Sequence, residues 1–392
     1  MYKSFIVGGK RTAIGSFMGE LKTVSGPSLS AVASLNLIES LKLNSSYIDS
    51  VYMGNVLSCG VGQNPARQAA LQAKLNIKTP CCNINKVCAS GLKSVTLASL
   101  ELWAGISSLS LCGGFESMSN SPHFVRPMRG GIRLGDGLIQ DSISFDGLTD
   151  AYSRSPMGTI TEQTASELGI DRTIQDEYAI LSYQRTISAI EGGLYERDIA
   201  PVELPNKLPF VKDEEPLRFN KDKLLSSRPV FAEKGKKGTI TAGNASKIND
   251  GAVSILVANQ NGLEKTGIKA RAEILGFADS EMEPHKFNLA PVEALKKALL
   301  HAKINLSEVD FFEVNEAFSV TPIAFMKTLD IGLDRVNLFG GAVSLGHPIG
   351  ASGSRILLNL INILENKGGK VGAAAICNGG GGATAVIVKL CS

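Results

Sequence analysis

"CASGLKSVTLASLEL", residues 88–102, has a counterpart later in the chain in "IGASGSRILLNLINIL", residues 349–364. In both stretches Ala-Ser-Gly opens a helix pattern. A basic residue stands two positions after the glycine, Lys93 in the first stretch and Arg355 in the second. In both, a strand pattern follows that we expect to end in a cysteine and glycines, at Cys112 and at Cys377.

The shared order of helix, strand and Cys-Gly indicates that one half-domain has been duplicated. The string Ala-Ser-Gly alone recurs by chance, so the order of the elements carries the inference. Strand patterns such as "SFIVGG" and "SLSLCGG" alternate with helix patterns, which predicts an α/β architecture. Two related halves packed together should bring their equivalent helix N-termini close to a shared centre.

The middle of the chain differs from both ends. It is richer in Pro, Gly and charged residues, and it holds helix patterns such as "TITEQTASELG" but little strand alternation. We interpret it as an insertion over the α/β body, where substrate contacts are common. We therefore expect an N-terminal half at 1–118 plus 248–268, a loop domain at 119–247, and a C-terminal half at 269–392.

Composition excludes several classes of protein. The 392 residues carry a net charge of only +3, which argues against a nucleic-acid-binding protein. No window offers about 18 uninterrupted apolar residues, so we expect no membrane span. The N-terminus lacks the apolar stretch of a signal peptide, and an odd number of cysteines, seven, favours reduced thiols in the cytoplasm. None of them forms a C-x-x-C pair, so we expect no metal site.

Cys88 directly precedes the first Ala-Ser-Gly helix start. The positive end of a helix dipole lowers the pKa of a nearby thiol, which suits a nucleophile. A small buried core residue is the other interpretation, because free cysteines are among the most buried residues. This segment alone leaves both open.

His347 stands in "GGAVSLGHPIGASG", residues 340–353, at the place in the second half that corresponds to Cys88 in the first. The other three histidines, His123, His285 and His301, have the sequence context of surface residues. A histidine in a glycine-rich turn is more often a loop-stabilising donor than a catalyst. The repeat, however, predicts that His347 meets Cys88 and forms a thiolate–imidazolium pair.

Two further stretches carry candidate residues. In "CNGGGGATA", residues 377–385, the glycines lack the lysine of a phosphate-binding loop and lead into a strand, so we favour Cys377 as a second reactive thiol beside an oxyanion hole. In "FFEVNEAFSV", residues 311–320, Asn315 either caps a helix or holds a water or carbonyl at the site.

Together these stretches resemble the thiolase family, because Cys88, Asn315, His347 and Cys377 occur in the family's order across nearly the whole chain. The resemblance implies two βαβαβαββ halves in a five-layer α-β-α-β-α sandwich with an inserted loop domain. It also implies a homodimer or homotetramer. Cys88 is then the acylated nucleophile, His347 its base and Cys377 the acid and base of the second step. The Gly379 N–H completes the oxyanion hole.

The middle of the chain resembles the acetoacetyl-CoA branch of that family in "DGLTDAY", "KDEEP" and "TITAGNASKINDGA". This implies acetyl-CoA, acetoacetyl-CoA and CoA as substrates and products, with no permanently bound cofactor. Pro156 stands where many biosynthetic members have His, and Phe287 where several have Met, so a chain-shortening 3-ketoacyl-CoA thiolase is the alternative. The CoA contacts that the resemblance implies are Leu148, Met157, Arg218, Phe231, Ala242, Ser246, Ala317 and Phe318.

Two other classes fit the sequence less well. A ketoacyl synthase shares the duplicated fold, but its Cys-His-His site needs a histidine where this chain has Asn315. A non-catalytic acyl-CoA-binding relative would lack one of Cys88, His347 and Cys377, and all three are present.

Overall fold

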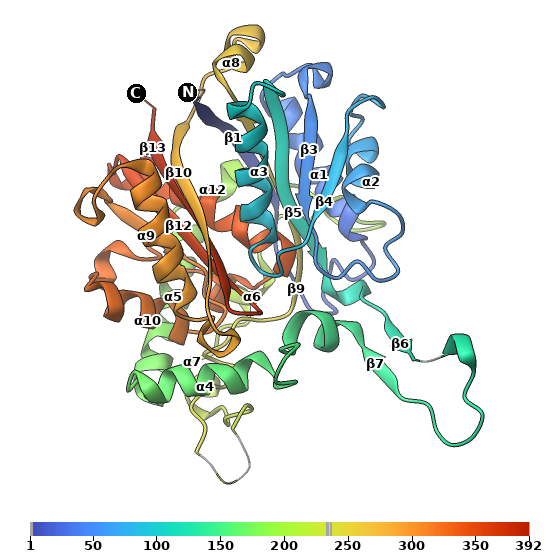
Figure 1. Cartoon of the computed structure of the whole chain (residues 1–392), viewed down its shortest axis with the longest axis vertical. Helices are drawn as coiled ribbons and strands as arrows, with labels where there is room; N and C mark the ends of the chain where they lie inside the picture. Colours follow the sequence, from blue (N-terminus) through green and yellow to red (C-terminus); the bar gives the residue numbers. More distant parts are fainter. Residues whose placement is uncertain (1–2, 127, 233–234, 236, 392) are drawn as a thin grey trace.

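The computed structural model of the protein describes residues 3–126, 128–232, 235 and 237–391. Two α/β halves form its body (Figure 1). The first half follows the expected βαβαβαββ order. Its elements are β1 (Ser4–Thr12), α1 (Gly26–Ser40), β3 (Ser50–Gly54), α2 (Pro65–Gln72), β4 (Cys81–Ile84), α3 (Ser90–Trp103), β5 (Leu109–Ser117) and β9 (Asn249–Ala258).

The second half repeats this order with one strand reduced. Where a counterpart of β4 is expected, the described residues form only an isolated bridge between Phe312 and Val336. A short helix, α11, precedes the last long helix. The elements are β10 (Ala272–Glu281), α9 (Ala290–Ala302), β11 (Phe311–Val314), α10 (Val320–Leu329), α11 (Ala342–Leu345), α12 (Ile349–Lys367), β12 (Val371–Asn378) and β13 (Gly382–Leu390).

The strands run in the order β11-β12-β13-β10-β1-β9-β5-β3-β4. The halves join where Ser4–Ile6 of β1 pairs antiparallel with Ala272–Ile274 of β10. Three buried apolar clusters separate the layers: α1 and α2 pack outside the first half, α3 and α12 lie between the halves, and α9 and α10 pack outside the second. The expected five-layer α-β-α-β-α arrangement is therefore present.

The N-termini of α3 and α12 meet at glycines. A Cβ on Gly91 would lie 2.7 Å from the carbonyl oxygen of Gly350, and one on Gly353 would lie 2.4 Å from the backbone nitrogen of Leu92. Only glycine permits two backbones to come this close. The expected meeting of equivalent helix starts at a shared centre is thus confirmed.

One sequence expectation about the repeat is wrong. β5 does not end at Cys112 but continues through Gly113 and Gly114 to Ser117. A Cβ on Gly113 would lie 2.0 Å from the Val253 carbonyl oxygen of β9, and Gly113 has φ +149°. These glycines allow neighbouring backbone to approach within a strand, and do not terminate it.

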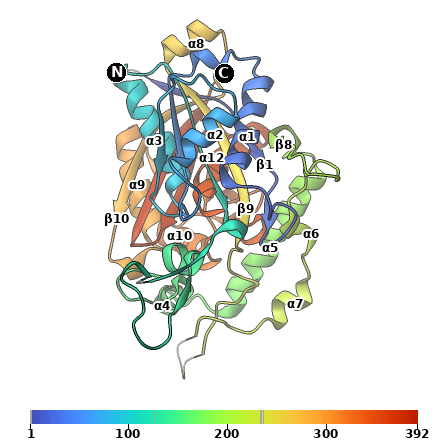
Figure 2. The same ribbon diagram turned by 90° about the vertical axis from the view of Figure 1, so that its right-hand side faces the viewer.

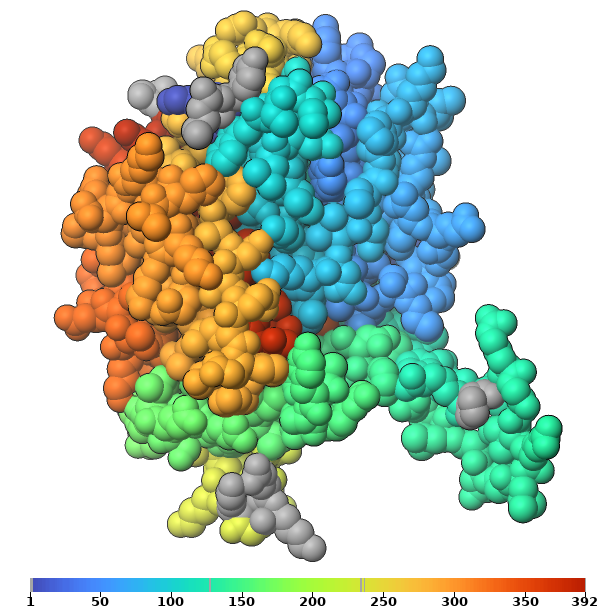
Figure 3. All heavy atoms as spheres, in the orientation of Figure 1, coloured from blue at the N-terminus to red at the C-terminus, as the bar shows by residue number. Residues whose placement is uncertain are grey.

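The middle of the chain lies mostly at the end of the body opposite α8 (Gln260–Thr266), as both ribbon views show (Figures 1 and 2). It begins with an arm, the hairpin β6–β7 and its loop, that stands away from the body in Figure 3. Helices α4 and α5 are those expected from the sequence patterns. Its elements are β6 (His123–Val125), β7 (Ile139–Asp141), the π-helix Ile143–Leu148, α4 (Met157–Glu167), α5 (Arg172–Glu191), β8 (Ile199–Ala200), α6 (Glu214–Leu217) and α7 (Lys221–Ser226).

None of the helices among the described residues combines the length and the hydropathy needed to cross a bilayer.

Candidate active site

Cys88 occupies a tight turn between β4 and α3. Val87, directly before it, has φ +47°, a left-handed conformation that is strained for a β-branched residue. Local hydrogen bonds hold the turn: the Val87 N–H donates to Asn85 Oδ1 at 3.0 Å, and Ser90 Oγ donates to the Val87 carbonyl at 2.6 Å. Strain maintained in this way is typical of functional turns.

Two backbone N–H groups, that of Gly379 and that of Cys88 itself, favour the thiolate of Cys88 and so act to lower its pKa. An oxyanion hole formed by these two N–H groups stays a prediction. The expected lowering of the thiol pKa is wrong, however. Burial raises the pKa of Cys88 to about 12, because desolvation outweighs these N–H groups. The resting thiol is therefore protonated.

His347 lies in the turn before α12 and is 5% exposed. Its Nδ1 lies 2.6 Å from Ser352 Oγ, which donates its own proton to the Pro348 carbonyl at 3.0 Å. The serine oxygen must therefore accept from Nδ1–H, which leaves a lone pair on Nε2. Burial, with a smaller contribution from the positive charge of Arg355, lowers the pKa of His347 to about 3. Nε2 has no partner among the described residues and can act as a neutral base.

Cys377 is buried near the end of β12. Burial raises its thiol pKa, and the charge that Cys88 would carry as a thiolate raises it further, so the two sulfurs lie within electrostatic reach of each other. A Cβ on Gly379, two residues after Cys377, would make ordinary van der Waals contact with the side chains of Val87 and Met157 at 3.7–3.8 Å. The two cysteine loops therefore face a common space.

Asn315 follows β11 and is fully buried. Its backbone N–H donates to the Ala375 carbonyl of β12 at 3.0 Å. The next helix, α10, begins at Val320 with Ser319 as its N-cap, so Asn315 is not the helix cap considered above. Its Oδ1 accepts from Arg355 Nη2 at 3.4 Å, while its Nδ2 has no partner among the described residues.

A buried carboxylate ties the two halves together behind these loops. Glu116 accepts hydrogen bonds from the Asn55 side chain and from the N–H groups of Val56, Leu57 and Gly350. Burial nevertheless raises its pKa to about 7. Because Gly350 is in the first turn of α12, Glu116 fixes the helix that follows His347.

A cavity of about 620 Å³ lies beside His347. Predicted CoA contacts line it from the loop insertion and from Phe318 of the second half. Ala317 is the exception: it does not line the cavity, and its carbonyl accepts the Ser246 N–H at 3.0 Å. The seven predicted residues in the lining are Leu148, Met157, Arg218, Phe231, Ala242, Ser246 and Phe318.

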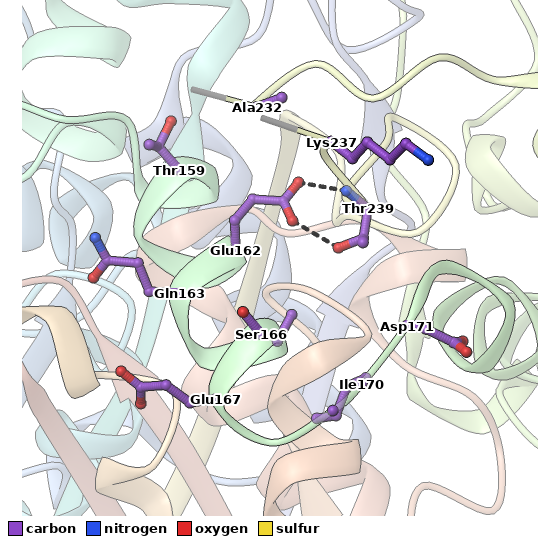
Figure 4. A pocket seen from close by; sticks show the side chains of 12 residues that line it. Thr159, Glu162, Gln163, Ser166, Glu167, Ile170, Asp171, Ala232, Lys237 and Thr239 are labelled. Carbon is purple, nitrogen blue, oxygen red and sulfur yellow. Dashed lines mark hydrogen bonds between the residues drawn. The ribbon is translucent and has the colours of Figure 1, made fainter. Parts of the chain in front are cut away.

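A second cleft, of about 550 Å³, runs along α4 (Figure 4). Its most prominent carboxylate, Glu162, is already occupied: it accepts from the backbone N–H and hydroxyl of Thr239 at 2.8 and 2.6 Å. None of the predicted site residues lines this cleft. We therefore interpret Glu162 as holding the 239–240 segment in place.

Comparisons with known proteins agree with this geometry. Residues 4–261 match the family model "Thiolase, N-terminal domain", and residues 268–390 match "Thiolase, C-terminal domain". This chain belongs to the thiolase family.

Two similar sequences and one similar solved structure agree with the thiolase assignment. An acetyl-CoA acetyltransferase of Schizosaccharomyces pombe is 42% identical over 391 residues, with 98% of each chain covered. A cytosolic acetyl-CoA acetyltransferase of Gibberella zeae is 41% identical over 390 residues, again with 98% of each covered. The Acat5 thiolase of Ascaris suum, solved in complex with coenzyme A, superposes with a TM-score of 0.94 at 36% identity over 99% of this chain and 100% of that one.

Several side chains around the thiolase site were not predicted. Ser352 belongs to the Ala-Ser-Gly string, which we expected only to open a helix, yet it fixes the tautomer of His347. Asn249 accepts the His347 N–H through Oδ1 at 2.9 Å. Lys247, which lines the cavity, stands in the quoted stretch "TITAGNASKINDGA" but was not singled out there. Glu116 and the cavity residue Phe17 carried no motif, since only the folded chain brings them to the site.

Proposed function

We propose that this thiolase is an acetyl-CoA C-acetyltransferase. It joins two acetyl-CoA molecules into acetoacetyl-CoA and CoA, reversibly, through an acyl-cysteine. The names of the full-length relatives support this activity over chain shortening. The observation that carries the chemistry is the Cys88 sulfur beneath two N–H groups, in a site that holds a neutral histidine with a free Nε2.

In the first half-reaction His347 Nε2 takes the Cys88 proton as the sulfur attacks the acetyl carbonyl carbon. The N–H groups of Cys88 and Gly379 hold the oxyanion, each contributing about 3 kcal/mol in comparable sites. The bond to the CoA sulfur then breaks, and CoA leaves with a proton from Cys377. A neutral resting pair suits this step, because the proton moves only while the carbon–sulfur bond forms.

In the second half-reaction the Cys377 thiolate removes a proton from the methyl carbon of a second acetyl-CoA. His347 and a group held by Asn315 stabilise the enolate oxygen. The carbanion attacks the acyl carbon on Cys88 and restores the Cys88 thiol through His347. No step needs a permanently bound cofactor, since the covalent chemistry is supplied by the two thiols.

The CoA moiety is proposed to lie in the 620 Å³ cavity beside His347. Its lining is mainly apolar around Met157, Phe231 and Phe318, which suits the pantetheine arm, and Arg218 offers a positive charge to a phosphate. Ala317 contributes through its contact with Ser246. The division into halves at 1–118 plus 248–268 and 269–392, around a loop domain at 119–247, is part of the same proposal.

We also propose a cytoplasmic homodimer or homotetramer. One full-length relative is named as cytosolic. The arm carries exposed apolar side chains, including Leu134 at 96% and Leu138 at 69% exposure, of the kind that assembly buries.

Thiolysis rates test the proposed substrate. With CoA as the second substrate, acetoacetyl-CoA should react faster than 3-ketoacyl-CoAs of eight or more carbons. The buried Phe287, which packs in one cluster with Cys377 and Phe318, leaves little room for a long chain beside the second thiol. A preference for the long chains would overturn this assignment in favour of a chain-shortening thiolase.

A further inference from the structure

Arg355 is a buried cation of the central helix α12. It occupies the position in the second half that Lys93 occupies in the first, but its surroundings differ. Lys93 pairs with Asp279 at 2.5 Å on a partly exposed edge. Arg355 is 3% exposed, and its Nε and Nη1 have no hydrogen-bond partner among the described residues. A charge of this kind is costly to bury and calls for a function.

The guanidinium determines how the Asn315 amide is oriented. Arginine carries only donors, so the group that faces Nη2 at 3.4 Å must be the amide oxygen. The Nδ2 of Asn315 then points away from Arg355, and it is buried without a partner among the described residues. It remains free to donate to a water or a substrate oxygen.

The positive charge of Arg355 is not cancelled by its surroundings. Glu313, on the strand that leads to Asn315, is its acidic neighbour, and burial raises the pKa of Glu313 to about 8, so it is mainly neutral at pH 7. Asp213 is paired with Arg11 at 2.7 Å, and the Asp198 carboxylate lies 3.7 Å from Arg197 Nε. The field of Arg355 reaches His347, whose protonated form it disfavours.

We propose that Arg355 is a positioning residue for the condensation half-reaction: it fixes the Asn315 amide with its N–H₂ toward the substrate and places a positive charge behind the enolate. The inference rests on the proposed function. It predicts opposite effects on the two half-reactions. Acylation puts a proton on His347, which the charge opposes, whereas condensation builds a negative oxygen, which the charge stabilises.

The test compares Arg355→Met and Arg355→Lys with wild type in two assays. Acylation is followed by trapping labelled acetyl on Cys88. Enolate formation is followed by exchange of acetyl-CoA methyl hydrogens with D₂O. In Arg355→Met acylation should persist, while exchange and condensation fall about 100-fold, the loss expected for one oxyanion-hole group. Arg355→Lys restores the positive charge and should therefore recover part of the exchange rate. Restored packing alone would not recover it.

The controls separate structure from positioning. Arg271→Met removes another arginine bound to α12, through Asn362 and Glu365, and should leave the ratio of the two rates unchanged. If Arg355→Met does not fold, Arg355→Met with Glu313→Gln also removes the buried acidic group beside the lost cation and decides the question by the same ratio. Equal loss of both half-reactions, or no loss, overturns the inference. A wild type without acetyl transfer overturns the proposed function instead.

Discussion

Burial is the largest influence on the resting protonation of Cys88 and His347. A pKa of about 12 for the thiol and about 3 for the imidazole leaves both neutral at pH 7. The helix α3 begins only at Ser90, with Ala89 as its N-cap, so Cys88 lies before the first turn, and desolvation outweighs the N–H groups of Gly379 and Cys88. The sequence could identify the residues, but their pKa values depend on packing that no local motif specifies.

Alkylation by iodoacetamide checks this state. Below the pKa of a thiol, the thiolate fraction rises about tenfold per pH unit, and the thiolate is the reactive form. The rate at Cys88 in the free enzyme should therefore keep rising from pH 6 to pH 9, as read by mass spectrometry of its peptide. The exposed Cys59 serves as the internal comparison. A rate that is already level at pH 6 would show a preformed thiolate–imidazolium pair.

Substitution of the two thiols separates their roles. Cys88→Ser should lose acyl-enzyme formation almost completely, because a serine hydroxyl is far less acidic than a thiol and is harder to activate as a nucleophile. Cys377→Ala should still become acylated by acetyl-CoA but should not condense, since the base for the methyl proton is gone. Radiolabel on the protein and acetoacetyl-CoA in solution report the two steps. Equal loss of both steps in Cys377→Ala would contradict the assignment.

At the level of elements, close backbone contacts bring the Cys88 and His347 turns together. Four glycines, Gly54, Gly91, Gly114 and Gly350, are packed where strands of the first half meet the starts of α3 and α12. The repeat in the sequence predicted that the two helix starts would meet. It could not show that Gly114 lies inside β5, because a glycine that ends a strand and one that admits a neighbour look alike in sequence.

Gly114→Ala tests this crossing. The added Cβ would lie 2.0 Å from the Gly350 carbonyl oxygen, so backbone must move. We expect the free energy of unfolding to fall by about 3 kcal/mol or more, which is at the upper end of the destabilisation usual for substitutions that overpack a buried site. We also expect reduced acetyl transfer per folded molecule, because α12 carries the His347 turn. Gly130→Ala, with nothing within 4 Å of its Cβ, should change neither urea unfolding nor activity.

At the scale of the molecule, strand and helix patterns predicted the duplicated body but did not by themselves predict the arm. Alternation of strand and helix patterns reports the layers, since each element buries one face against the next. In the second half the counterpart of β4 is reduced to the Phe312–Val336 bridge. The hydrophobic pattern of the sequence does not predict this loss. The arm buries little of its apolar surface within this chain: Leu134, Leu138 and Ile139 remain 96%, 69% and 65% exposed. Its residue pattern places it in the insertion rich in Pro, Gly and charge, and only the family resemblance suggested an arm there.

The arm's exposed leucines make oligomerisation measurable. In the proposed homo-oligomer they pack against another copy, and a charge placed there would have to be desolvated. Light scattering after gel filtration should give wild type the mass of a dimer or tetramer, and Leu134→Asp with Leu138→Asp a smaller mass. Leu208→Asp, at a leucine 88% exposed outside the arm, should leave the mass unchanged. A wild-type monomer, or an arm variant of wild-type mass, would refute the role of the arm in assembly. Exposed leucines stabilise an oligomer only where assembly removes their apolar surface from water.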